Sequence, residues 1–422
     1  MIKFLYISFF FPPLGGAESR YNLSLIRRLY AKDFLPTIVI APNDYPYPKD
    51  QYLEKLIPEK IEIKRISWFY QPSKYVNKAR ELIRIPQNPL VFKGWRNLYE
   101  TARAEAISES YKFIYSVHGI GAAHLAALRI KRETHLPWVA EFRDPWFHNF
   151  IFRKYMKDKS WKWWYAYQLR KTRKLLGKVL KYADLIVIES PMHGEFMVKD
   201  FGIEKDKVVP CGMGYDEDYF SENENCLVNF TQKPVIGFVG SVYYGYEDAV
   251  RNFILALKEL EKRGHGFTFV SVGGASSLFS KYAQEVGLKS FIPIDKVSLC
   301  KALSLMKKMD FGVVCTFSKH KSHINSKLWE YLKSSLSILA IVPEDGAMAK
   351  IVKEGKCGYV LPYNAKEMIP ILKKALNNYG EGKVLRANPE FIAQFSRERM
   401  VDKLVEKIEE MICKKQKTIK RQ

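Results

Sequence analysis

Short apolar runs alternate with longer segments of helical spacing along the whole chain. In the first half this pattern predicts strands at 3–8, 36–41, 113–117, 138–141, 184–189 and 207–209. The second half restarts it with a strand at 234–240, a helix at 247–263 and strands at 267–272, 311–316, 337–342 and 358–361. Strands and helices that alternate in this way build parallel sheets from βαβ units, so the sequence predicts an α/β fold.

The chain length indicates two such domains. At 422 residues the chain exceeds the size at which a single hydrophobic core stops growing. We expect two Rossmann-like domains, at 1–215 and 233–394, joined by the polar segment 216–232. Residues 395–412 read as a closing helix, and 413–422 form a basic tail. Two domains of this type should face each other across a cleft at the carboxyl ends of their strands.

A candidate anion site lies in the segment NSKLWEYLKSSLSILA, residues 325–340. Lys327 and Glu330 are three residues apart and share one helical face, while Leu328, Tyr331 and Leu332 form the apolar face. Asn325 or Ser326 can serve as the N-cap, which would leave free backbone N–H groups beside Lys327 for a phosphate. The alternative is an ordinary surface salt bridge worth roughly 0.2–0.5 kcal/mol.

A second candidate anion loop follows the first strand. The sequence FFFPPLGG at 9–16 leads into a helix from Ala17, and Gly15 and Gly16 would let backbone N–H groups approach a ligand. The loop has neither the GxGxxG spacing of dinucleotide folds nor the GxxxxGK[ST] of P-loops. A plain tight turn is the alternative interpretation.

Six segments in order resemble one family of enzymes. They are FFPPLGGAE (10–18), WVAEFRDPW (138–146), VPCGMGYDEDYF (209–220), GFVGSVYYG (237–245), SKLWEYL (326–332) and FSRERMVDKLVEKI (395–408). Together they resemble the GT-B fold glycosyltransferases of family 4, the retaining, group 1 type that uses nucleotide-sugar donors. The resemblance implies a hexosyltransferase and a last helix that crosses back to the first domain.

The resemblance also implies roles for residues of the donor side. Glu330 matches the second glutamate of an E-x7-E motif, which binds the nucleotide ribose, whereas Ser322 stands where the first glutamate is expected, so the donor sugar stays open. Ser241 stands where many members carry an arginine that grips the pyrophosphate. We therefore expect Lys327, Gly16 and the helix start at Ser326 to neutralise the diphosphate leaving group. No metal and no cofactor besides the nucleotide-sugar is expected.

Four residues are candidates for the acceptor side. His118 ends a predicted strand where members of the family often place a histidine, and Asp144 follows another strand in EFRDPW. Asp144 is expected to orient an acceptor hydroxyl, with Arg143 and Glu141 behind it. A structural histidine, or a simple pair between Arg143 and Asp144, are the alternatives.

The net positive charge of the chain indicates what kind of surface it binds. The net charge is +23, and residues 1–215 carry 36 basic and 21 acidic side chains, which is +15 of that total. Within this half, the stretch 150–183 mixes basic and aromatic residues, and we expect membrane docking through Arg153, Lys154, Lys162, Trp161, Trp163 and Trp164. Such a mixture suits an anionic membrane surface and a lipid-linked or glycan acceptor. A solvated helix with its aromatics packed on the core is the alternative.

Several other classes of function lose support. The sequence Asp216-Glu217-Asp218 forms a D-x-D, but it enters the linker, and the six cysteines have no metal-site spacing. No convincing secretory signal and no apolar run long enough to span a bilayer is present, so we expect a cytoplasmic protein, peripheral at the inner face of the membrane. The alternatives are a nucleic-acid binding protein, a nucleotide-sugar epimerase and a phosphorylase. The preferred interpretation, a glycosyltransferase, predicts no nucleic-acid partner.

Overall fold

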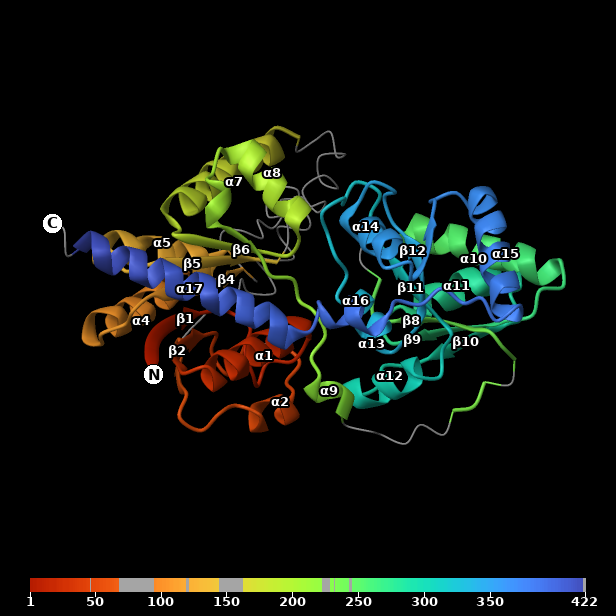
Figure 1. Ribbon diagram of the computed structural model, residues 1–422, viewed down its shortest axis with the longest axis horizontal. Helices are drawn as coiled ribbons and strands as arrows, with labels where there is room; N and C mark the ends of the chain where they lie inside the picture. Colours follow the sequence, from red (N-terminus) through yellow and green to blue (C-terminus); the bar gives the residue numbers. More distant parts are fainter. Residues whose placement is uncertain are drawn as a thin grey trace, which may run out of the picture. The chain divides into compact units, whose positions relative to one another are not determined.

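The computed structural model divides the chain into two compact units, Met1–Gly212 with Met400–Gln422, and Met213–Arg399 (Figure 1). It describes residues 1–45, 47–67, 95–118, 121–143, 162–221, 228–230, 232–242 and 245–419. The predicted linker 216–232 begins with a short helix, α9 (Asp218–Ser221), and part of it lies outside the described residues.

The first unit is built on a seven-stranded parallel sheet with the order β3-β2-β1-β4-β5-β6-β7 (Figure 1). Its strands are β1 (Ile2–Ile7), β2 (Phe34–Ile40), β3 (Glu62–Arg65), β4 (Ile114–His118), β5 (Trp138–Phe142), β6 (Leu185–Ile188) and β7 (Val208–Pro210). Leu5, Ile7 and Trp138 are among the fully buried residues of its core. Strands covered on both faces read as continuous apolar runs, which is why the sequence located the central ones.

Helices connect these strands. They are α1 (Ala17–Ala31), α2 (Gln51–Lys55), α4 (Trp95–Ser108), α5 (Ala122–Thr134), α7 (Lys162–Tyr182), α8 (Pro191–Phe201) and the 3-10 turn η2 (Lys205–Lys207). Local chemistry sets several of their ends. Ser190 caps α8 by accepting a hydrogen bond from the N–H of His193, and Gly202 ends it in the left-handed conformation.

The second unit repeats the plan with a six-stranded parallel sheet of order β10-β9-β8-β11-β12-β13. Its strands are β8 (Val235–Val239), β9 (Thr268–Val272), β10 (Phe291–Ile294), β11 (Phe311–Cys315), β12 (Ser337–Ile341) and β13 (Gly358–Leu361). The helices that follow α9 in this unit are α10 (Glu247–Lys262), α11 (Ser276–Val286), α12 (Leu299–Met306), α13 (Lys327–Lys333), α14 (Ala347–Glu354), α15 (Ala365–Gly380) and α16 (Pro389–Ala393). The two parallel-sheet α/β units confirm the predicted fold class.

The last helix, α17 (Arg397–Ile419), returns to the first unit. Val401, Leu404 and Ile408 are fully buried on one stripe of it. Lys415 Nζ lies 3.1 Å from Asp184 Oδ1, and Asp184 also pairs with Lys131. The helix runs past the predicted end at 412 into the expected tail, because the lysine-rich segment that follows is made of good helix formers.

The sequence pattern missed two strands, β3 and β10, which are both edge strands of their sheets. β3 reads EIKR and is only partly buried, so it has no apolar run. β10 reads FIPI, and its Pro293 argues against a strand unless the strand lies at an edge. The other strands agree with the prediction to within two residues.

Candidate functional site

The predicted pair on α13 is present. Lys327 Nζ forms an ion pair with Glu330 Oε2, and the two side chains are 18 % and 19 % exposed. The opposite face of the helix is buried through Leu328, Tyr331 and Leu332. The pair is thus mostly shielded but reachable from solvent, which makes its charge interaction stronger than that of a fully exposed surface pair.

The start of α13 has the predicted cap at Asn325 but differs from the prediction in its backbone N–H groups. Asn325 Oδ1 accepts a hydrogen bond of 3.0 Å from the N–H of Lys327, whereas Ser326 makes no side-chain cap. The N–H groups of Leu328 and Trp329 donate to the carbonyl oxygens of Asn325 and Ser326, at 3.0 and 3.2 Å. The expectation of free backbone N–H groups beside Lys327 is therefore wrong, because the tight first turn already uses them.

Helix α13 is held firmly against the sheet. The N–H of Val239, at the end of β8, donates to the Tyr331 hydroxyl at 2.8 Å. A Cβ on Gly312 of β11 would lie 2.6 Å from the Tyr331 ring, so only glycine fits there. The ring of Trp329 stacks on Phe395 at 4.4 Å. These contacts fix the helix that carries Lys327 and Glu330 to two central strands.

A cluster of glycines lies next to Lys327, at the carboxyl ends of β8 and β9. Gly240 has φ +134°, and a Cβ built on it would lie 3.8 Å from Lys327 Cε. Gly273 has φ +100° and packs against the Gly240 carbonyl, while a Cβ on Gly274 would lie 2.7 Å from Ser241 Oγ. This places the predicted donor residue Ser241 on the same turn. Glycines here leave room for a ligand to approach the backbone closely.

The segment between β11 and α13 carries buried polar groups. The Thr316 hydroxyl is fully buried and has no hydrogen-bond partner among the described residues. Tyr363 donates to the Thr316 carbonyl at 3.0 Å, and burial raises the pKa of Tyr363 to about 12, so it stays a hydrogen-bond donor at neutral pH. Ser322, which stands in the place of the family's first glutamate, is 4 % exposed.

In the first unit, the glycine turn precedes α1 as predicted. Gly16 has φ +92°, a conformation that favours glycine, and a Cβ on it would lie 3.2 Å from the Tyr47 hydroxyl. The N–H of Gly15, however, donates to the Pro48 carbonyl at 2.6 Å. Gly15 therefore does not offer its N–H to an anion, because the turn consumes it.

Glu141 and Arg143 belong to a buried network at the end of β5. Arg143 Nε lies 3.3 Å from Glu141 Oε1, and its guanidinium stacks 3.7 Å from the Tyr21 ring centroid. Tyr115 donates to Glu141 at 2.7 Å, and Arg143 also donates to Asn22. Burial is the largest single influence and lowers the pKa of Arg143, but the Glu141 carboxylate together with Tyr21, Tyr6 and Glu18 raises it more, so the net shift is upward. The network holds the Arg143 guanidinium charged and fixes both side chains in place.

The remaining acceptor-side candidates are only partly covered by the structure. His118 is the last residue of β4, directly at the carboxyl edge of the sheet, and its side chain lies outside the described residues. Asp144 also lies outside the described residues, directly after Arg143. The assignments of His118 and Asp144 stay predictions.

The predicted docking stretch contains α7. Trp163 is 66 % exposed and Tyr167 44 % exposed, with the Lys171 ammonium 4.6 Å from the Tyr167 ring centroid. The core side of the helix is formed by Leu176, Val179 and Leu180. These two aromatic side chains therefore do not pack on the core. Lys162 and Trp164 lie on α7 with undescribed side chains, and Arg153, Lys154 and Trp161 lie outside the described residues.

Within the described ranges, no group of three or more His, Cys, Asp or Glu side chains is placed to hold a metal ion. In the same part of the chain, no helix is both long and apolar enough to cross a bilayer.

Comparison with known proteins places this geometry in a family context. Residues 233–378 match the family model "Glycosyl transferases group 1", and no curated protein matches the chain. Among solved structures, Anabaena HepE in complex with UDP-glucose is similar at 13 % identity and a TM-score of 0.64, covering 97 % of this chain and 100 % of that one.

Two further structures are similar over most of their length. WaaG, a glycosyltransferase involved in lipopolysaccharide biosynthesis, has 14 % identity, a TM-score of 0.55 and coverage of 96 % and 94 %. UDP-GlcNAc 2-epimerase from Neisseria meningitidis, bound to UDP-GlcNAc, has 11 % identity, a TM-score of 0.58 and coverage of 97 % and 100 %. The chain therefore has the GT-B fold, and the segment of its second unit that matches the group 1 glycosyltransferase model includes Lys327, Glu330 and the glycine cluster.

Proposed function

We propose that this protein is a retaining glycosyltransferase of family 4 that transfers a hexose from a nucleotide-sugar, with UDP as the nucleotide. The observation that carries the proposal is the shielded Lys327–Glu330 pair beside Gly240, inside the region that matches the glycosyltransferase model. UDP is favoured because HepE and the epimerase were solved with UDP-sugars.

The pair supplies two different interactions to such a donor. The Lys327 ammonium leaves Glu330 to neutralise the diphosphate, which gains negative charge as the bond to the sugar breaks. The Glu330 carboxylate, released from Lys327, accepts hydrogen bonds from the ribose hydroxyls. The acceptor oxygen bonds to the anomeric carbon on the face that the diphosphate leaves, and a phosphate oxygen takes the acceptor proton. In this proposal the Lys327 ammonium supplies part of the counter-charge, and no bound metal takes part.

A thermal-shift screen tests the donor. UDP, GDP, ADP, TDP, CMP and their sugar conjugates are added without metal, and a ligand that binds only the folded state raises Tm. We expect a shift with UDP that is lost in Glu330→Ala, and a turnover lowered by orders of magnitude in Lys327→Ala. No shift with any nucleotide, or near-normal turnover in Lys327→Ala, would contradict the proposal.

We propose a lipid-linked or cell-surface glycan acceptor at the cytoplasmic face of the membrane. The support is the exposed Trp163 and Tyr167 on α7 among lysines, in a half of the chain with net charge +15. Each basic residue near an anionic surface adds about 1 kcal/mol to binding. Sedimentation with anionic liposomes at low salt checks this: wild type should pellet, and Trp163→Ser should pellet less. A protein that stays in the supernatant counts against docking.

A second candidate is a nucleotide-sugar epimerase, since epimerases share the fold. The group 1 glycosyltransferase match favours transfer. Incubating the protein with a UDP-sugar and no acceptor separates the two. An epimerase converts the sugar to its epimer, whereas a transferase leaves it intact or hydrolyses it slowly.

A further inference from the structure

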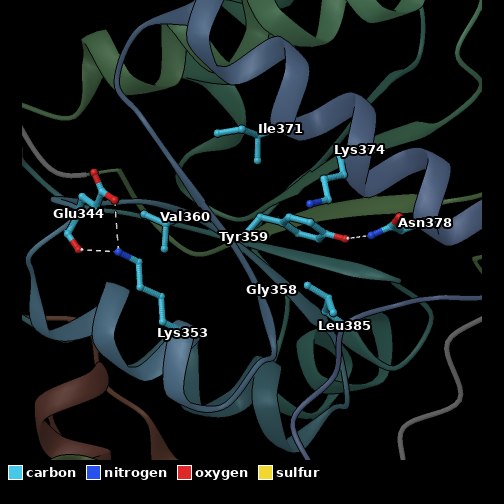
Figure 2. A pocket seen from close by; sticks show the side chains of 9 residues that line it. All are labelled: Glu344, Lys353, Gly358, Tyr359, Val360, Ile371, Lys374, Asn378 and Leu385. Atoms are coloured by element: carbon cyan, nitrogen blue, oxygen red, sulfur yellow. Dashed lines mark hydrogen bonds and ion pairs between the residues drawn. The ribbon is translucent and has the colours of Figure 1, made fainter.

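A hollow of about 500 Å³ opens beside β13 in the second unit (Figure 2). It is lined by residues of β13, α14, α15 and two loops: Glu344, Lys353, Gly358, Tyr359, Val360, Ile371, Lys374, Asn378 and Leu385. None of them belongs to the site around Lys327. The volume lies within the range of small-molecule sites, about 300–1,000 Å³.

The floor of the hollow is the free edge of a sheet. β13 is last in the strand order, and within the described part of the chain it pairs only with β12. The N–H of Ile338 donates to the Cys357 carbonyl at 2.8 Å, and Ile338 is in register with Gly358. In a parallel ladder, the backbone groups of Gly358 and Val360 therefore face away from β12, toward the hollow.

The walls combine apolar side chains with one unneutralised charge. Lys353 is tied to Glu344, with Nζ 3.3 Å from the carboxylate and 3.3 Å from the carbonyl oxygen. Figure 2 shows Lys374 reaching from α15 toward Tyr359, and Lys374 forms no ion pair with any described residue. Lys374 thus leaves a net positive charge at the hollow.

Tyr359 supplies a second polar group. Its hydroxyl accepts a hydrogen bond of 2.8 Å from Asn378 Nδ2, so its own proton is free to donate to a ligand. The side chain is 8 % exposed, and its position is fixed by that bond and by its place on β13. In a hollow that both residues line, a preorganised donor and an unpaired ammonium favour an anion.

We propose that this hollow binds a small organic anion, with one negatively charged head on an apolar body. The Lys374 ammonium and the Tyr359 hydroxyl hold the head, which is a carboxylate or a phosphate monoester, and Ile371 and Leu385 contact the apolar part. The site is separate from the donor site and does not depend on the proposed transferase activity.

Calorimetric titration of the full-length protein tests the site with hexanoate and hexyl phosphate as probes. Hexan-1-ol and hexylamine serve as probes without charge and with the opposite charge. At least one of the two anions should bind saturably. Comparison of hexanoate with hexyl phosphate shows whether the site prefers a carboxylate or a phosphate monoester. Hexanol and hexylamine should bind at least fivefold more weakly than the better anion.

Variants assign the binding to this hollow. Lys374→Met should weaken the anion at least fivefold, whereas Lys373→Met, an exposed lysine on the same helix that does not line the hollow, should change it less than twofold. Glu344→Gln should tighten it, because it releases the Lys353 ammonium. UDP affinity should be equal in wild type and Lys374→Met.

Three results would overturn the proposal. The first is that neither anion binds saturably at concentrations up to about 10 mM, roughly the weakest affinity of interest for a small ligand. The second is that hexylamine binds as tightly as the better anion. The third is that Lys374→Met and Lys373→Met lose anion affinity equally. Because both lysines are exposed, neither variant is expected to disturb folding.

Discussion

Replacing Glu330 by glutamine should change the affinities for UDP and for pyrophosphate in opposite directions. The substitution keeps the shape of the side chain but removes the charge that binds Lys327. A carboxylate that accepts hydrogen bonds from the ribose contributes about 1.5–3 kcal/mol, more than a neutral amide. The freed Lys327 ammonium offsets about 1 kcal/mol of this loss at the diphosphate of UDP, so we expect the Kd for UDP to rise about 2-fold to 30-fold, since about 1.4 kcal/mol is a factor of ten.

Pyrophosphate has no ribose, so the substitution costs it no hydrogen bond and only frees the Lys327 ammonium to bind it. Both side chains of the pair are about four-fifths shielded, so the pair is worth more than the roughly 0.2–0.5 kcal/mol of an exposed helical pair. Breaking it should lower the Kd for pyrophosphate by about 3-fold to 10-fold, which corresponds to about 1 kcal/mol.

Isothermal titration of both ligands checks this, with Glu354→Gln as the matched control. Glu354 pairs with Lys350 on the exposed surface of α14, where the two side chains are 58 % and 69 % exposed. The control should leave both affinities unchanged. If Glu330→Gln weakens both ligands equally, or neither, the reasoning about Lys327 and Glu330 is refuted.

Three stability predictions follow from other parts of the structure. Burial raises the pKa of Glu261, but its hydrogen bonds from Lys258 and the Ser290 N–H outweigh this effect and lower the pKa from 4.5 to about 2. The stability that Glu261 adds is therefore complete above pH 4.5 and disappears as the pH falls toward 2. Denaturant unfolding should find Glu261→Gln less stable by about 1–2 kcal/mol at pH 7, with the gap to wild type narrowing below pH 4.5 and closing near pH 2; a gap independent of pH contradicts this. Gly16→Ala should lower the free energy of unfolding by about 1–2 kcal/mol, because Gly16 has a positive φ. A lower Tm measures this loss, and Gly380→Ala, at the end of α15, is the control. Ile408→Ala on α17 should cost about 2–5 kcal/mol, and a cost below about 1 kcal/mol would mean that the helix does not complete the core.

Buried strands were the most predictable part of the fold. The runs around Leu5, Val239 and Ile338 are apolar throughout, because central parallel strands are covered on both faces. Strand β3 escapes this logic, since it lies at the edge of its sheet and its residues are polar and only partly buried. The register of the strands depends on packing across the sheet, which no local pattern encodes.

The candidate site was predictable in its charges but not in its backbone. The spacing of Lys327 and Glu330 was sufficient to predict that they share a face. The use of the Lys327 N–H by Asn325 follows from the predicted cap, whereas the use of the Gly15 N–H by Pro48 depends on a segment distant in the sequence, for which the sequence contains no signal. Gly240 and Gly273 each directly follow a buried strand, but the sequence has no signal that they are neighbours of each other.

The return of α17 to the first unit has a consequence for synthesis on the ribosome. The second unit is one continuous segment, Met213–Arg399, whereas the first needs both the beginning of the chain and Met400 onward. Domains generally fold as units as they emerge. The first unit is therefore translated first but completed last, and the surface that later covers Val401, Leu404 and Ile408 stays open while the whole second unit is made. A nascent chain stalled at residue 399 should bind chaperones through this apolar surface, and one extended past residue 419 should release them.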